Sequence, residues 1–329
     1  MPETLNLFYL EPDPDRWFPG DRHPRRLIRR IVRGPRRPGG QERVFLNLKA
    51  GLRQLGVPFR ENDFAYARKH QEEPVGIIGK PHVLDMMEWK NPILFGAAVM
   101  SHPTDDPDLL QRKPIRKVLV PGEWMRKMCE PFWGGKVEAW PVGIDTDLWC
   151  PAPEVKKEYD FLIYDKVRWE HDRYEKELIE PIRSELRRQS LSFVEIRYGH
   201  YKEEDFHSLL KRCKAMIFLC EHETQGIAYQ QALSMNIPIL AWDRGGFWQD
   251  PEFYPQRAKY GPVSSVPYWD DRCGKVFQNI GIFPSLLKEF RGKIDSAKLD
   301  PRPYILENLS LKKCAEKYVD AYKSISVGG

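Results

Sequence analysis

Short runs of consecutive apolar residues are separated by amphipathic and polar segments along most of this 329-residue chain. In the first half, the runs at Val75–Gly79 and Ile93–Met100 lack the alternation of a half-exposed strand, as expected of parallel strands covered on both faces. We therefore predict a parallel sheet in this half. Its predicted strands are Leu5–Leu10, Val75–Gly79, Ile93–Met100, Lys117–Val120 and Val137–Pro141.

Amphipathic segments between these runs predict helices. One helix is expected to begin at Gly39-Gly40, with apolar residues along one face, and to end at Gly56. Another is expected from about Glu123 to Phe132. The first half therefore reads as strands connected by helices.

The same pattern restarts in the second half, after a proline-rich linker at residues 151–153. Residues 247–285 are rich in Pro, Gly, Trp and Tyr, and their apolar residues follow neither the period of a strand nor that of a helix. Leu306–Ile325 predicts one or two helices. The predicted strands are Asp160–Tyr164, Phe193–Arg197, Ala215–Leu219 and Pro238–Trp242. The predicted helices are Arg173–Gln189, Glu203–Cys213 and one that starts after Gly226.

Strands that alternate with helices in both halves predict an α/β fold of two doubly wound domains, with a ligand cleft between them. The length of the chain agrees with two domains. We place the first domain at residues 1–150 and the second at 151–305. Residues 306–329 are expected to form a helical segment that packs back on the first domain.

Composition points to a cytoplasmic protein. No uninterrupted apolar stretch reaches the length of a transmembrane helix, and the first residues do not read as a signal peptide. The six cysteines show no metal-like spacing, so reduced thiols are expected.

Positive charge is concentrated in one segment. The chain has a net charge of +5, yet the nine arginines from Arg16 to Arg37 are accompanied by a single acid, Asp21. Within this segment, Arg25–Arg33 would place apolar residues on one helical face and arginines on the other. Three roles remain open for this segment. It can be a solvated loop, a site that binds an anionic acceptor or the inner membrane surface, or a nucleic-acid contact. The last ranks lowest, because no nucleic-acid-binding motif accompanies the segment, and no nucleic-acid partner is expected.

The stretch from Cys220 to Gly246 carries the most chemical information. A buried strand stops at an acidic turn, a helix follows Gly226, and a second strand ends in Asp243 and glycines. Polar residues at such strand ends are where open α/β sheets bind ligands. A helix that begins after a glycine offers free N–H groups to an anion. The stretch therefore predicts a phosphate-bearing ligand with Glu223 beside it.

Several segments, taken in order, resemble the retaining glycosyltransferases of the GT-B fold, most of all glycosyltransferase family 4 (group 1). The last of them aligns with that family's signature of two glutamates separated by seven residues. The segments are Gly39-Gly40 with QERVFLNLKAGLRQLG, His102 beyond a buried strand, VPGEWMRKM and WPVGIDTDLWCP between Val120 and Pro151, YGHYKEEDFHSLLKRCKAMIFL from Tyr198, and Glu223 to Ala232.

The resemblance implies two Rossmann-like domains that face a central cleft and a UDP-, GDP- or ADP-linked sugar donor, with retention of anomeric configuration. It implies no metal, and Asp145 and Asp147 are then structural. The acceptor stays unknown. The implied catalytic residues are His102, Arg168, Arg173 and Glu223. The implied donor-binding residues are Gly39, Gly40, Lys166, Tyr198, Gly199, His200, Thr224, Gln225, Gly226, Ile227 and Gln231.

Sugar transfer builds negative charge on the departing diphosphate and positive character on the sugar, so the site needs cations and a polar group. Arg168 and Arg173 are two cations five residues apart and are candidates to stabilise the diphosphate. Lys166 is an alternative candidate for this role. Glu223 would bind sugar hydroxyls, although it could instead cap the following helix.

The chain departs from the family pattern at Gln231, where the signature has its second glutamate. An amide keeps an acceptor oxygen for the ribose but loses the negative charge. Thr224 and Gln225 also replace the usual Gly-Phe. A non-catalytic nucleotide- or sugar-binding protein on the same fold therefore stays open as an alternative.

Overall fold

The computed structural model describes residues 4–12, 16–18, 20–21, 24–25, 28, 39–96 and 101–326. The chain divides into two compact units. Unit 1 consists of Met1–Val120, Cys129–Val142 and Ala315–Gly329, and unit 2 consists of Pro121–Met128 and Gly143–Cys314.

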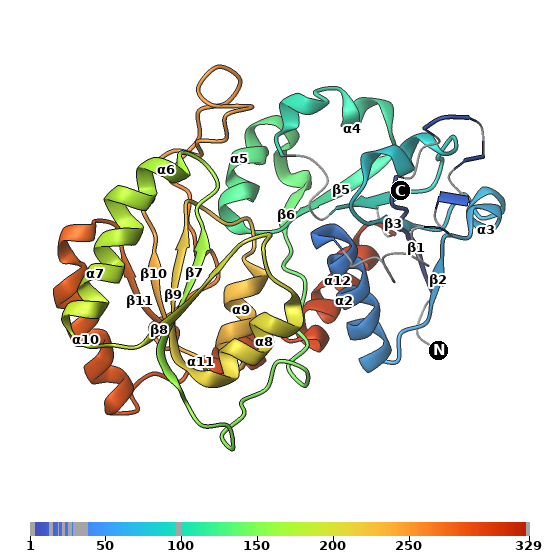
Figure 1. Ribbon diagram of the computed structural model, residues 1–329. Coiled ribbons are helices and arrows are strands. Elements are labelled where there is room, and N and C mark those ends of the chain that lie inside the picture. The colour runs from blue at the N-terminus through green and yellow to red at the C-terminus, as the bar shows by residue number, and fades with distance from the viewer. Residues whose placement is uncertain are drawn as a thin grey trace. The chain divides into compact units, whose positions relative to one another are not determined.

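Unit 1 contains a parallel sheet of six strands in the order β2-β1-β3-β4-β5-β6 (Figure 1). All four residues of β1 are buried, which agrees with a strand covered on both faces. The strands are β1 (Leu5–Phe8), β2 (Phe59–Glu61), β3 (Val75–Ile77), β4 (Ile93–Phe95), β5 (Ile115–Val120) and β6 (Val137–Ala139). The helices that lie wholly or partly in this unit are α2 (Gly40–Gln54), α3 (Phe64–Lys69), α4 (Leu109–Arg112), α5 (Glu123–Trp133) and α12 (Leu311–Ser324).

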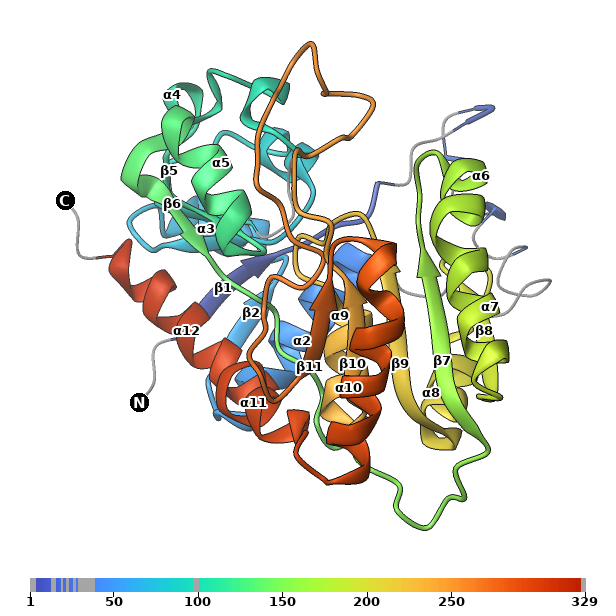
Figure 2. The same cartoon turned by 90° about the vertical axis from the view of Figure 1, so that its left-hand side faces the viewer.

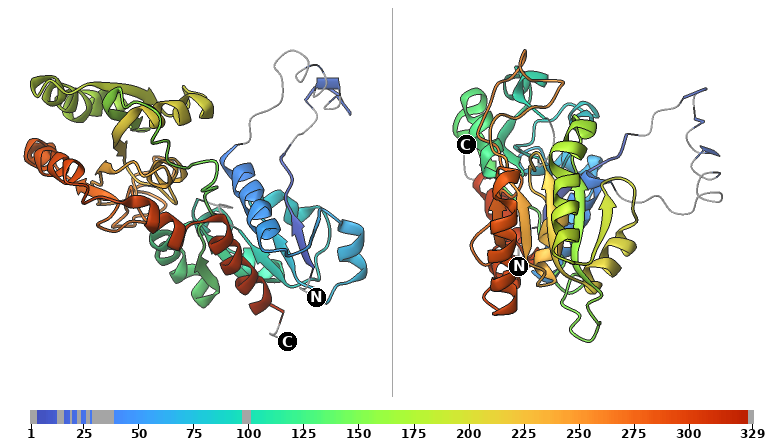
Figure 3. Two further views of the ribbon diagram at one scale, coloured as in Figure 1. Left: turned by 90° about the horizontal axis from the view of Figure 1, so that it is seen from below. Right: turned by 60° about the vertical axis from the view of Figure 1, so that its left-hand side comes forward.

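The final helix α12 packs beside the strands of unit 1 (Figure 3). The hydroxyl of Tyr322 accepts a hydrogen bond from the backbone N–H of Asn6 at 3.0 Å. Tyr318, one turn earlier, is fully buried, and a β-carbon at Gly76 would lie 2.1 Å from its hydroxyl oxygen. Strand β3 therefore needs a glycine where Tyr318 crosses it.

Unit 2 contains a parallel sheet of five strands in the order β11-β10-β9-β7-β8 (Figure 2). The strands are β7 (Tyr159–Lys166), β8 (Phe193–Arg197), β9 (Cys213–Cys220), β10 (Ile239–Trp242) and β11 (Gly274–Phe277). The helices are α6 (His171–Tyr174), α7 (Glu180–Arg188), α8 (Glu203–Arg212), α9 (Ile227–Ser234), α10 (Phe283–Asp295) and α11 (Pro301–Asn308).

Alternate residues of these strands enter two separate hydrophobic cores. Leu162 and Met216 pack with residues of α8, α9 and α11, whereas Phe161, Ile163 and Ile217 pack with residues of α7 and α10. Both faces of the sheet are thus covered by helices (Figure 1).

The strand order of unit 2 reverses between β7 and β9. The chain leaves β7 toward one edge of the sheet to form β8, and leaves β9 toward the other edge to form β10 and β11. The carboxyl ends of β7 and β9 are adjacent, with Lys166 opposite Cys220. Open α/β sheets bind their ligands at such a point.

The structure confirms the predicted α/β class and both parallel sheets. It adds β2 and β11, which were not predicted, and β11 lies in the region that matched neither period. The helix predicted at Arg173–Gln189 is interrupted by a π-helical segment at Glu175–Ile179. The arginine-rich stretch Arg25–Arg33 falls largely outside the described residues. Among the described helices, none is long and apolar enough to cross a membrane.

The contact between Gly76 and Tyr318 can be tested by a double-mutant cycle. Gly76→Ala should lower the free energy of unfolding by about 1–3 kcal/mol, because the new methyl group overlaps the Tyr318 hydroxyl. Tyr318→Phe should restore most of this loss, because that hydroxyl is buried with no hydrogen-bond partner among the described residues. Urea denaturation measures all four proteins, and equal losses with and without Tyr318→Phe would contradict the assigned overlap.

Candidate functional site

A buried ion pair occupies the point where the strand order of unit 2 reverses. Lys166, the last residue of β7, donates a hydrogen bond to the carboxylate of Glu223, which follows β9. The two side chains are only 14% and 9% exposed. Burial opposes the charge of Lys166, but attraction by the Glu223 carboxylate outweighs it and raises the pKa of the ammonium. Lys166 is therefore a charged group at neutral pH, and it also lies 4.5 Å from the ring centroid of Tyr198.

The loop after β7 is held by a second carboxylate. One carboxylate oxygen of Glu221 accepts hydrogen bonds from the backbone N–H groups of Arg168 and Trp169, both at 2.8 Å. Glu221 is 2% exposed, and its other oxygen is buried with no partner among the described residues. Glu221 therefore fixes the backbone that carries Arg168.

The guanidinium of Arg168 is fixed by aromatic and imidazole groups. It lies 4.7 Å from the ring centroid of Trp169, and one of its nitrogens is 3.3 Å from Nε2 of His222. Trp169 in turn stacks on His222, with centroids 5.1 Å apart and planes at 28°. Arg168 is thus an exposed residue whose guanidinium is oriented by Trp169 and His222.

His222 is a buried neutral imidazole. Its Nε2 accepts a hydrogen bond from the indole N–H of Trp248 at 3.0 Å, so the ring proton belongs on Nδ1. Burial lowers the pKa of His222 to about 3, with further contributions from the positive charges of Arg168, Arg244 and Lys166. The single acceptor lone pair of the neutral imidazole, at Nε2, is therefore approached by both Trp248 and Arg168, at 3.0 and 3.3 Å.

The turn before α9 requires a glycine. Gly226 has a φ of +86°, and a β-carbon there would lie 2.0 Å from the ring of Tyr229. The predicted donor-binding residues around it are partly committed to internal contacts, since the side-chain amide of Gln225 donates to Gln230 at 3.1 Å. Gln231 is 8% exposed on α9. The N-terminal N–H groups of α9 are therefore presented by a turn that tolerates no side chain at its cap.

The main chain of Glu223 is held from two sides. Its carbonyl accepts the indole N–H of Trp124 at 2.7 Å, and its N–H donates to the carbonyl of Ser264 at 2.9 Å. Ser264 is itself tied to Asp243, whose carboxylate accepts its hydroxyl at 2.8 Å. The carboxylate of Glu223 therefore projects from a rigid backbone.

Other predicted site residues lie on the surface of unit 2. Arg173 is 54% exposed and pairs with Glu177 at 2.9 Å and with Glu170 at 3.5 Å, as a solvated helical charge does. Tyr198 is half exposed, and Gly199 and His200 are exposed in the same turn. Thr224 and Ile227 are partly buried on either side of Gly226. The structure thus brings Lys166 into contact with Glu223 and with Tyr198, and the roles of all the predicted site residues stay predictions.

Three predicted site residues belong to unit 1. Gly39 caps α2 with ordinary backbone angles, and no described atom lies near a β-carbon placed at Gly39 or Gly40. His102 is 3% exposed and caps the short helix Pro103–Asp105, because its Nδ1 accepts the backbone N–H of Thr104 at 3.2 Å. A capping role thus accounts for the position of His102, and its catalytic role stays a prediction.

The sequence did not identify Glu221, His222, Trp124 or Trp248 as parts of this site. Glu221 and His222 directly follow a buried strand, and that position was the available signal. Trp248 lies in the stretch from 247 to 285, where no periodic pattern exists. Its role depends on a contact with His222, 26 positions away.

Potential metal ligands were compared over the described residues alone. Within them, His70, Glu72 and Glu73 of unit 1 bring their ligand atoms within 4.8 Å of one another. The carboxylate of Glu73 already accepts hydrogen bonds from Asn6 at 3.0 Å and Tyr66 at 2.8 Å. This group is therefore explained by internal hydrogen bonding.

The chain is similar along its whole length to solved structures of glycosyltransferases. AviGT4, a glycosyltransferase involved in avilamycin A biosynthesis, matches with a TM-score of 0.59 and 14% identity over 100% of this chain and 99% of that chain. HepE of Anabaena, solved in complex with UDP and glucose, matches with a TM-score of 0.55 and 8% identity over 98% and 100% of the two chains.

A third similar structure is a variant of S. aureus TarM in complex with fondaparinux, α-GlcNAc-glycerol and UDP. It matches with a TM-score of 0.54 and 15% identity over 78% of this chain and 57% of that chain. No family model and no curated protein matches the sequence. At these identities the similarity shows the fold, which is GT-B-like and confirms the fold and the resemblance predicted from the sequence.

The two hydrogen bonds to Glu221 predict unequal effects of two substitutions. Glu221→Ala should lower the free energy of unfolding by about 2–4 kcal/mol, because two partly buried N–H groups lose their charged acceptor. Glu221→Gln keeps an acceptor oxygen and should cost markedly less. Denaturant unfolding compares them, and equal losses would show that the carboxylate does not hold this loop.

The neutral state of His222 predicts a pH dependence of stability. The folded pKa of about 3 lies below the ordinary value of 6.5, so the unfolded state binds a proton first as the pH falls. The contribution of neutral His222 to the free energy of unfolding is complete above about pH 6.5. It is lost as the pH falls toward 3, at about 1 kcal/mol per pH unit. His222→Gln keeps an acceptor and should flatten this slope between pH 6.5 and 4.5. An unchanged slope in denaturant titrations would contradict a neutral buried His222.

Proposed function

We propose that this protein is a retaining glycosyltransferase that transfers a sugar from a nucleotide-sugar donor to an acceptor. The observation that carries this proposal is the arrangement at the ends of β7 and β9. There Lys166 pairs with the carboxylate of Glu223, and the loop after β7 carries a second cation, Arg168, beside His222. This is the charge distribution that nucleotide-sugar cleavage needs.

The diphosphate side of the reaction would be served by the two cations and by α9. As the bond between the anomeric carbon and the phosphate oxygen breaks, negative charge grows on the diphosphate. Lys166 has three N–H donors, so it can keep its bond to Glu223 while donating to a phosphate oxygen. The N–H groups that follow Gly226 add donors from the helix N-terminus.

Glu223 would serve the sugar side. Its carboxylate is held close to Lys166 and can accept hydrogen bonds from sugar hydroxyls while positive character develops on the ring. Because Trp124 and Ser264 fix its main chain, the carboxylate needs little reorganisation before the reaction.

The solved neighbours support a uridine diphosphate donor. HepE was solved with UDP-glucose as well as with UDP and glucose, and TarM with UDP. For the ribose, the amide of Gln231 would replace the carboxylate of the family signature and contribute a weaker, uncharged contact. Retention of configuration and the absence of a catalytic metal are carried over from the resemblance as part of the proposal.

Gln231 also favours a second candidate, a nucleotide- or sugar-binding protein without transferase activity. Both candidates would bind a nucleotide or a sugar, but only the glycosyltransferase would hydrolyse or transfer the sugar of a donor. A nucleoside diphosphate that raises the melting temperature, without hydrolysis of any UDP-, GDP- or ADP-sugar, would favour the binding protein.

Glu223→Gln provides the direct test of catalysis. It should lower donor hydrolysis or transfer by about 10²–10³-fold, because the charge that faces the sugar is lost, while the thermal shift given by UDP persists. Glu289→Gln, on the exposed surface of α10, is the matched control and should leave turnover unchanged. Full activity of Glu223→Gln, or no thermal shift with UDP, GDP or ADP, would reject the proposed function.

A further inference from the structure

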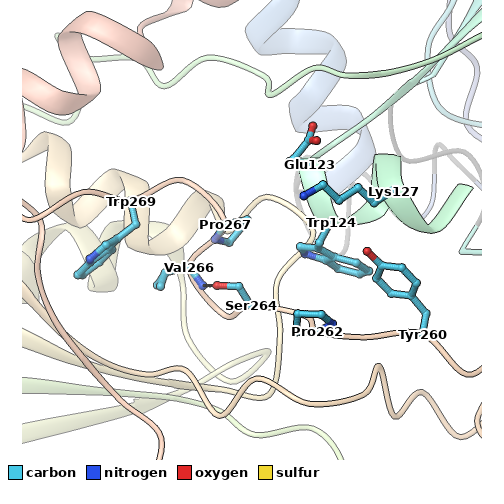
Figure 4. Close-up of a pocket in the computed structure, with 9 residues that line it drawn as sticks. All are labelled: Glu123, Trp124, Lys127, Tyr260, Pro262, Ser264, Val266, Pro267 and Trp269. Atoms are coloured by element: carbon cyan, nitrogen blue, oxygen red, sulfur yellow. Dashed lines mark hydrogen bonds between the residues drawn. The ribbon is translucent and has the colours of Figure 1, made fainter. Parts of the chain in front are cut away.

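A cavity of about 320 Å³ lies in unit 2, beside the first turn of α5 (Figure 4). Its walls come from that turn and from the segment between β10 and β11. None of the residues that line it was predicted as a site residue. They are Glu123, Trp124, Lys127, Tyr260, Pro262, Ser264, Val266, Pro267 and Trp269.

The cavity adjoins the main chain of Glu223. Trp124 and Ser264 both line it, and these are the two residues whose groups bond the carbonyl and the N–H of Glu223, at 2.7 and 2.9 Å. Trp124 also presents its ring at 84° to His222, with centroids 5.7 Å apart. A molecule bound in the cavity would therefore touch two residues that fix the backbone of Glu223, Trp124 through its indole and Ser264 through its carbonyl.

One wall of the cavity is lined by aromatic rings and prolines. The rings of Trp124 and Tyr260 lie at 26° to each other with centroids 6.3 Å apart, and prolines extend this surface (Figure 4). The indole N–H of Trp124 is already used by Glu223, so Trp124 offers the cavity an apolar surface only. Such a surface suits a rigid ring that has one apolar face.

The polar groups at the cavity have opposite charges. Glu123 supplies a carboxylate, which also pairs with Arg126 at 2.8 Å, and Lys127 supplies an exposed ammonium. Because Arg126 already pairs with Glu123, these charges give an amine no net attraction and a phosphate only the single exposed cation Lys127. Groups that both donate and accept, such as hydroxyls, can satisfy both ends.

We propose that this cavity is a carbohydrate-binding subsite, in which a neutral pyranose lays its C–H face on Trp124 and Tyr260 and directs hydroxyls toward Glu123 and Lys127. Its assignment as the acceptor subsite rests on the proposed function. In that reaction, an acceptor hydroxyl oxygen bonds to the anomeric carbon of the donor sugar. The bond from that carbon to the diphosphate oxygen breaks, and the hydroxyl proton leaves with the diphosphate.

The full-length protein can be titrated with defined neutral sugars while its tryptophan fluorescence is followed. The probes are the methyl glycosides of glucose, galactose, mannose and N-acetylglucosamine, together with maltose and cellobiose. At least one probe should bind in about the millimolar range, and inorganic phosphate should not compete with it. If none binds, or if phosphate competes, the proposed subsite is wrong.

Substitutions at Tyr260 test whether the sugar binds in this cavity. Tyr260→Ala should weaken sugar binding about tenfold, because it removes half of the ring platform, whereas Tyr260→Phe should bind nearly as well as the wild type. Tyr254→Ala changes a tyrosine of the same segment outside the cavity and should have no effect. Unchanged binding in Tyr260→Ala would overturn the assignment, provided its melting temperature shows a folded protein.

The thermal shift given by UDP separates this inference from the proposed function. If UDP raises the melting temperature but no sugar binds, the proposed glycosyltransferase function stands and the proposed subsite is wrong. If a sugar binds but no nucleotide raises the melting temperature, the subsite stands as a sugar-binding site and its role as an acceptor site is wrong. If both proposals hold, Tyr260→Ala should raise the KM for the bound sugar as acceptor about tenfold and leave donor hydrolysis unchanged.

Discussion

A lysine and a glutamate share a buried position at the reversal point of a parallel sheet, and the proposed function depends on this pair. Removing either partner of such a pair leaves an uncompensated buried charge, at a cost on the order of several kcal/mol. Lys166 and Glu223 therefore constrain each other and the strand ends that carry them. The surrounding contacts of Glu221, Trp124 and Ser264 then set the backbone on both sides of the pair.

The sequence predicted the fold because two-sided burial leaves a clear pattern. Strands such as β9 are continuous apolar runs, and the polar residues that end them marked the edge of the sheet where Lys166 and Glu223 pair. The same reasoning identified Glu223 and Gly226, whose positions depend on local chain geometry. Lys166 was identified as one of several cations, and the structure shows that it is the one bound to Glu223.

The rest of the site could not be predicted because it is built by contacts between distant residues. His222 acquires its neutral state from burial and from charges on other loops, and Trp248 meets it from a segment without periodicity. The cavity beside Glu223 likewise needs Trp124 and Tyr260, which are 136 positions apart in the sequence. Arg173 was predicted from spacing alone; it pairs with Glu170 and Glu177 on an exposed helix, and its catalytic role stays a prediction.

The central claim is that Lys166 and Arg168 bind a diphosphate at the ends of β7 and β9. Phosphorus-31 NMR of UDP titrated with the protein tests it most directly, because it observes the phosphates themselves. Both phosphorus resonances should shift on binding, and Lys166→Ala combined with Arg168→Ala should abolish the shift in a protein that remains folded. Resonances that do not move with the wild type, or that move equally with the double variant, would contradict the claim.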